Sequence, residues 1–119
     1  MKPKALIIED DEEQLYIFAE ALRSAEFDTE VVRDGRQAIS RFDETQPAVV
    51  ILDLHLPYVS GEEILAHIRA QEVAVPTRVI LATADPHTGK LLETKADLVL
   101  LKPISFIQLR ELASRFRPS

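Results

Sequence analysis

The chain has 119 residues, of which 14 are Lys or Arg and 20 are Asp or Glu, so its formal net charge is −6. This acidity argues against non-specific binding of nucleic acid, and the absence of cysteine excludes disulfides and thiolate chemistry. No apolar run approaches the roughly 20 residues of a membrane span, and Met1 to Lys4 lead into a strand without a signal-peptide core. The sequence therefore predicts a cytoplasmic protein with one domain over residues 1–119.

Short aliphatic runs alternate with segments of helical periodicity along the chain. In chain order they predict strand 5–8, helix 12–24, strand 29–32, helix 36–43, strand 49–53, helix 61–69, strand 79–82, a short helix within 85–96, strand 98–101 and helix 105–116. Continuous aliphatic strands are typical of parallel sheets that are buried on both faces. The alternation of strands and helices favours an α/β fold, with a doubly wound five-stranded parallel sheet.

Polar residues at the expected helix starts support these boundaries. Asp34 can cap the helix that begins at residue 36. Ser60 with Glu63, and Ser105 with Gln108, have the spacing of a capping box, in which a hydroxyl and a residue three positions later bond reciprocal backbone amides.

Four of the expected strands end on residues that carry chemistry. The first leads into Glu9 and Asp10, the third ends on Asp53, the fourth leads into Thr83, and the fifth into Lys102. Parallel strands bring their carboxyl ends to one edge, and open α/β sheets bind ligands at that edge. The sequence therefore predicts that three carboxylates, one hydroxyl and one amine converge there.

The charges of this cluster restrict its chemistry. Carboxylates ~4 Å apart repel by several kcal/mol near a protein surface, so either one of them holds a proton or a cation lies among them. Oxygen ligands without His or Cys at ligand spacing favour a hard divalent ion, and Mg²⁺ above others. A carboxylate nucleophile beside a cation, an amine and a hydroxyl is suited to phosphoryl transfer.

These residues resemble the receiver domains of two-component response regulators, from Lys4 to about Phe116. The features that match are an acidic pair after the first strand, Asp53 after the third, Pro57 and Gly61 in the loop that follows, Thr83 with Ala84, and Lys102 with Pro103. The resemblance implies a flavodoxin-like sheet with strand order 2-1-3-4-5 and a cis bond between Lys102 and Pro103.

The same resemblance implies a function for each site residue. Asp53 would accept a phosphoryl group from a sensor histidine kinase or a histidine phosphotransfer protein, assisted by Thr83 and Lys102. Mg²⁺ would be held by Asp10, Asp53 and the backbone carbonyl of His55, with Glu9 acting mostly through water. Such a domain is no enzyme beyond its own phosphorylation and dephosphorylation, and it binds neither nucleic acid nor membrane.

The family's output face is made of the fourth helix, the fifth strand and the fifth helix, and it also offers a route to a homodimer. Here the sequence departs from the family. Val99 replaces the usual aromatic residue, whose ring swings inward when the hydroxyl residue moves toward the phosphoryl group. Only 19 positions separate Thr83 from Lys102, about one helical turn fewer than usual, and Pro86 and Gly89 interrupt the segment between them. These departures predict a shortened fourth helix of about two turns and a weakened relay to the output face.

Three alternatives remain open at this stage. A phosphohydrolase of the haloacid dehalogenase type also uses a strand-end aspartate, but it needs a second aspartate where this chain has His55. A flavodoxin-like mononucleotide binder needs a phosphate loop where residues 10–13 are acidic. A degenerate receiver would act only as a protein-interaction module. Within the receiver interpretation, His55 and Asp85 are expected to stand at the mouth of the site and to pair there.

Overall fold

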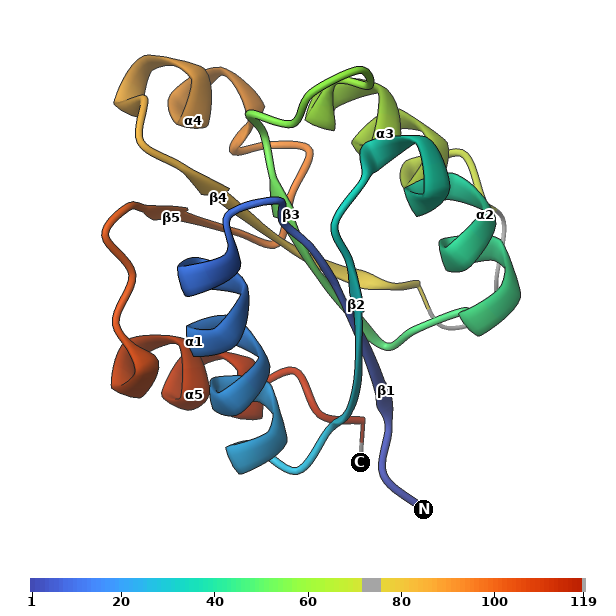
Figure 1. The fold of residues 1–119 in the computed structure, drawn as a ribbon, viewed down its shortest axis with the longest axis vertical. Helices are drawn as coiled ribbons and strands as arrows, with labels where there is room; N and C mark the ends of the chain where they lie inside the picture. Colours follow the sequence, from blue (N-terminus) through green and yellow to red (C-terminus); the bar gives the residue numbers. More distant parts are fainter. Residues whose placement is uncertain (72–75, 119) are drawn as a thin grey trace.

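The computed structural model describes residues 1–71 and 76–118, and within them it contains five strands and five helices (Figure 1). The predicted domain over residues 1–119 includes residues 72–75 and Ser119, which lie outside the described part. The elements are β1 (Lys4–Ile8), α1 (Glu12–Ser24), β2 (Asp28–Val32), α2 (Gly35–Thr45), β3 (Val49–Asp53), α3 (Gly61–Arg69), β4 (Arg78–Thr83), α4 (Pro86–Leu92), β5 (Leu98–Leu101) and α5 (Phe106–Ser114).

The strands form one parallel sheet with the order β2-β1-β3-β4-β5, which confirms the predicted fold class and strand order. The order reverses between β1 and β3, since the chain moves outward to β2 first and returns to place β3 on the other side of β1. Ligands bind open α/β sheets at such a reversal, outside the carboxyl ends of the strands. A ligand site is therefore expected at the carboxyl ends of β1 and β3.

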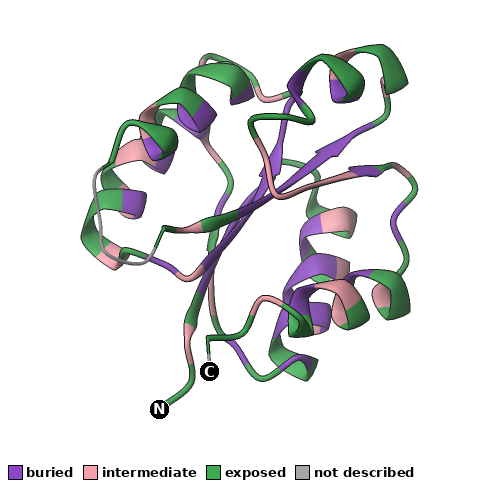
Figure 2. Cartoon of the chain, turned by 180° about the vertical axis from the view of Figure 1, so that it is seen from behind, coloured by how far each residue is buried: buried purple, intermediate pink, exposed green. Residues whose placement is uncertain are grey.

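Both faces of the sheet are buried, and each face has its own core (Figure 2). Ile7, Ile51 and Ile80 face α1 and α5, whereas their neighbours Leu52 and Leu81 face α2, α3 and α4. Side chains alternate across a strand, so a strand with a core on each side must be apolar throughout. Complete burial of each such side chain contributes about 1.5–3 kcal/mol. None of the described helices is long and apolar enough to cross a lipid bilayer.

The predicted helix starts are confirmed, because each capping side chain accepts a backbone hydrogen bond. Asp34 accepts from the amide of Arg36, Ser60 from that of Glu63, and Ser105 from that of Gln108. The boundaries differ by one or two residues at some ends. For example, α5 ends at Ser114, two residues before the predicted end at residue 116.

The fourth helix has seven residues, which confirms the predicted length of about two turns, but its two supposed breakers have other roles. Pro86 occupies the first turn, where a helix tolerates proline, and the Asp85 side chain caps that turn. A Cβ added to Gly89 would lie 3.0 Å from Cγ1 of Val99 and 3.3 Å from Cγ2 of Thr83. Gly89 therefore allows α4 to approach β4 and β5 closely.

Candidate functional site

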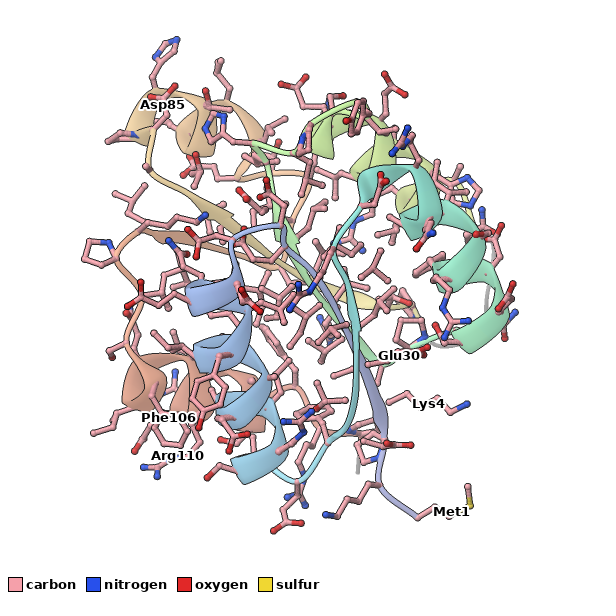
Figure 3. The ribbon with its side chains drawn as sticks, in the orientation of Figure 1. Met1, Lys4, Glu30, Asp85, Phe106 and Arg110 are labelled. Atoms are coloured by element: carbon pink, nitrogen blue, oxygen red, sulfur yellow. The ribbon has the colours of Figure 1, made fainter. Side chains whose placement is uncertain are left out.

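The carboxyl ends of β1, β3, β4 and β5 lie side by side, as the sequence predicts. The sheet register aligns Ile8 with Leu52, and Asp53 with Ala82. Backbone bonds extend the pairing by one residue, because the amide of Lys102 donates to the carbonyl of Thr83 at 2.8 Å. Glu9, Asp53, Thr83 and Lys102 are therefore held by backbone bonds of the sheet, and Asp10 follows Glu9 in the next loop. The edge lies at the α4 end of the molecule, where Asp85 stands, and opposite Met1 and Lys4 (Figure 3).

Three of the predicted residues form an acidic cluster. Carboxylate oxygens of Glu9, Asp10 and Asp53 all lie within 4.8 Å of one another. Glu9 and Asp53 are 0% and 2% exposed, whereas Asp10 is exposed to solvent. Buried like charges at this spacing repel one another when no cation lies among them. A set of hard oxygen donors that is open to solvent on one side fits a hydrated Mg²⁺ ion.

Lys102 partly compensates for the negative charge. Its Nζ atom donates to Oε1 of Glu9 at 3.1 Å and lies 3.4 Å from Oδ2 of Asp53. The side chain is only 15% exposed, so its positive charge lies beside the two buried carboxylates and reduces the repulsion between them. Lys102 precedes a cis peptide bond to Pro103, as the resemblance implies.

The pKa of Glu9 is raised from 4.5 to about 7, chiefly by burial and then by the hydrogen bond to Asp53 and the charge of Asp53. The amide of Asp11, which donates to Oε2 at 3.2 Å, and the charge of Lys102 oppose this shift and lower the pKa. Without a cation, Glu9 is thus the carboxyl of the cluster that burial and Asp53 drive toward its neutral form.

The raised pKa of Glu9 predicts how stability depends on pH in a chelator-treated sample. The folded state binds the proton more tightly than the unfolded state, so stability falls as pH rises from about 4.5 to about 7. At ~1.4 kcal/mol per pKa unit, the loss amounts to as much as ~3 kcal/mol. Urea unfolding across this range measures it.

Glu9→Gln should flatten this pH dependence, whereas Glu13→Gln, at an exposed position of α1, should leave it unchanged. An equal slope in the native chain and in Glu9→Gln would show that another group carries the titration.

The surroundings of Thr83 differ from the sequence-based expectation. Its Oγ1 atom lies 3.2 Å from Nε2 of His55 and accepts a hydrogen bond from the amide of Asp85 at 3.0 Å. The Asp85 carboxylate instead accepts from the amide of His87 and from the Thr88 hydroxyl. The expected pair between His55 and Asp85 is therefore wrong for this structure, because capping of α4 occupies the carboxylate.

The contact between His55 and Thr83 was not predicted from the sequence, since it depends on how β3 and β4 align. The role of Asp85 as a helix cap was not predicted either. The Asp-Pro pair at positions 85 and 86 is a start signal for a helix and could have revealed that role.

The loop after Asp53 needs a glycine at position 61, one of the residues that match the receiver pattern. A Cβ on Gly61 would lie 2.7 Å from Cα of Leu54 and 2.9 Å from the carbonyl oxygen of Asp53. The start of α3 therefore packs directly against the backbone of Asp53 and Leu54. The amide of His55 also donates to Oδ1 of Asp53 at 3.0 Å, which orients the carboxylate.

The fold is similar to that of a CheY-like response regulator receiver domain from Methylobacillus flagellatus, with a TM-score of 0.85 at 25% identity over 98% of this chain and 99% of that chain. A family model for the response regulator receiver domain matches residues 5–114, and the chain belongs to that family. Receiver domains accept phosphoryl groups in two-component signal transduction and interact with histidine kinases; they are signalling modules and not classical enzymes. This function separates the chain from the phosphohydrolase and mononucleotide-binding alternatives.

Individual relatives agree with this assignment. The transcriptional regulatory protein TrcR of Mycobacterium tuberculosis is 37% identical over 117 residues, which cover 96% of this chain and 44% of TrcR. The DNA-binding response regulator MtrA of Mycolicibacterium paratuberculosis is 34% identical, with 98% of this chain and 51% of MtrA covered. The chain thus spans about half the length of the curated relatives it matches.

One similar solved structure contains a metal. It is the receiver domain of the sensor histidine kinase PA1611 from Pseudomonas aeruginosa, with a magnesium ion coordinated in its active site cleft. It superimposes with a TM-score of 0.84 at 25% identity and covers 98% of each chain.

Proposed function

We propose that Asp53 is the phosphoacceptor of a single receiver domain that extends over residues 1–119. The observation that carries this assignment is the convergence on Asp53 of a lysine, a second and third carboxylate and a backbone amide, all at the switch point of the sheet. A carboxylate at the end of a buried strand has no need of such surroundings for packing. They do suit a nucleophile that must gain and lose a highly charged group.

In the proposed reaction, a carboxylate oxygen of Asp53 forms a bond to phosphorus while the bond from phosphorus to the donor nitrogen breaks. The electron pair of the broken bond remains on the imidazole of the donor. Lys102 lies near enough to Asp53 to exchange its contact with Glu9 for one with a phosphoryl oxygen. The hydroxyl of Thr83 supplies a further hydrogen bond to that group, so that these side chains stabilise the charge that accumulates there.

We assign the metal-binding role to Glu9, Asp10, Asp53 and the backbone carbonyl of His55. The close carboxylates, the exposed position of Asp10 and the raised pKa of Glu9 support a cation among them. When bound, Mg²⁺ would supply positive charge that neutralises the phosphoryl oxygens. The backbone of His55 is already tied to Asp53 through its amide.

A mass measurement tests the proposal. The native chain, incubated with acetyl phosphate and Mg²⁺, should gain one phosphoryl group in the intact mass spectrum, and the same gain should follow from a phosphorylated histidine kinase or histidine phosphotransfer protein. No gain from either donor, with Mg²⁺ bound, would overturn it.

We further propose that phosphorylation changes the α4–β5–α5 face only weakly. Val99 has no ring that can move, and α4 is already helical with its cap formed in this structure. Amide exchange with and without beryllofluoride, a mimic of the phosphoryl group, should show changes at the loops of Asp53, Thr83 and Lys102. Residues 85–96 should gain little protection.

Strong new protection across residues 85–96 would contradict this muted response and would favour ordering of α4 as the switch. Light scattering on the same samples tests the homodimer. Leu91 and Leu101 are exposed on the α4–β5 part of the face, and a doubled mass with beryllofluoride would show that this face pairs two copies.

A further inference from the structure

The hydroxyl of Thr83 has fixed partners at rest, and one of them is the His55 side chain. The hydroxyl oxygen lies 3.2 Å from Nε2 of His55, and the amide of Asp85 donates to it from 3.0 Å. Thr83 is fully buried, whereas His55 is exposed at the surface. The ring bridges the end of β3 to the end of β4.

The contact with His55 uses one of the few hydrogen bonds that the Thr83 hydroxyl can form. A threonine hydroxyl has one proton to donate and can accept two bonds. Because the amide of Asp85 already donates to the oxygen, His55 takes either the only proton or the remaining acceptor position. Where Nε2 of His55 accepts the only proton, that proton must turn away from the ring before Thr83 can donate it to a group on Asp53.

The rest of the Thr83 side chain is also packed in this rotamer. Its methyl carbon lies against Gly89 of α4, where an added Cβ would come within 3.3 Å. The ring contacts Thr83 and not Asp85, whose carboxylate accepts from the His87 amide and the Thr88 hydroxyl. The ring of His55 is thus free to hold Thr83.

We infer that His55 is a positioning residue that holds the Thr83 hydroxyl away from the phosphoryl site and lowers the fraction of molecules ready to bind the phosphoryl group. This inference rests on the proposed function. A ligand that binds only the released conformation has an apparent affinity reduced by that fraction. One hydrogen bond of ordinary strength corresponds to about a three- to tenfold change in the equilibrium.

The first measurement is the affinity for beryllofluoride in the presence of Mg²⁺ at one fixed pH. His55→Leu removes the bond and should bind about three- to tenfold more tightly than the native chain. His55→Gln retains a polar group of similar reach and should bind like the native chain. Unchanged or weaker binding by His55→Leu would overturn the inference, as would equal tightening by both variants.

A double-mutant cycle shows whether His55 acts through Thr83. In a Thr83→Val background the hydroxyl is absent while the shape is kept, so His55→Leu should then change the affinity less than twofold. The same gain in both backgrounds would mean that His55 acts by another route, such as access to the site, and would rule out the holding role.

The contact itself is measurable without any ligand. Thr83→Val should shift the ring ¹⁵N resonances of His55 in the free protein and leave those of His67, which contacts Asp43, in place. No shift at His55 would overturn the inference. If the shift is seen and no chain binds beryllofluoride, the proposed function fails and the inference fails with it. If the native chain binds but His55→Leu binds equally, the inference alone fails.

Discussion

Acetyl phosphate and Mg²⁺ are expected to phosphorylate the native chain once and to leave the Asp53→Asn variant unmodified. Asparagine has nearly the same shape as aspartate, so the variant keeps the bond from the His55 amide to Oδ1 while it loses the anionic nucleophile. The loss of uptake should be complete. Intact mass spectrometry followed by peptide mapping after borohydride trapping measures both the amount and the position.

The matched control is Asp28→Asn, an exposed aspartate at the start of β2 and at the opposite edge of the sheet from the site. It should be phosphorylated to the native extent. Uptake by Asp53→Asn equal to that of the native chain would place the acceptor elsewhere and remove the central assignment.

Addition of Mg²⁺ is expected to raise the melting temperature of the native chain, and Asp10→Ala is expected to abolish that rise. The ion binds the folded state and relieves the repulsion among Glu9, Asp10 and Asp53, which lie within 4.8 Å. At a concentration about tenfold above the Kd, binding stabilises by ~1.4 kcal/mol. For a domain of this size the rise is about 5 °C. Scanning calorimetry at increasing Mg²⁺ measures it.

Two features make the Asp10 test specific. Asp10 is exposed, so its replacement should change the fold less than replacement of the buried Glu9 or Asp53. Glu13→Ala changes the net charge by the same amount on an exposed position of α1 and should retain the full rise. An undiminished rise in Asp10→Ala would place the metal outside the acidic cluster.

Much of the fold follows from local sequence patterns. Aliphatic runs and helical periodicity predict all ten elements, because strand and helix periods of 2 and 3.6 residues determine which side chains reach a core. The capping residues Asp34, Ser60 and Ser105 mark three helix starts through bonds to amides only two or three residues away. Such short-range geometry is readable without the tertiary structure. The strand order came from the resemblance, since pairing between strands is not local.

The features of the site likewise fall into those that follow from the sequence and those that depend on the tertiary structure. By itself, the sequence determined which residues stand at the strand ends, because a continuous aliphatic run ends where its first charged or hydroxyl residue appears. It also determined the acidity of the cluster. Only the tertiary structure decided that His55 contacts Thr83 and not Asp85, since a rotamer choice depends on which partners the neighbouring strand offers and which are already bonded. Likewise, only packing distinguishes Gly89 as a point of close approach from Gly89 as a helix breaker, because the distance from α4 to Val99 is a property of three assembled elements.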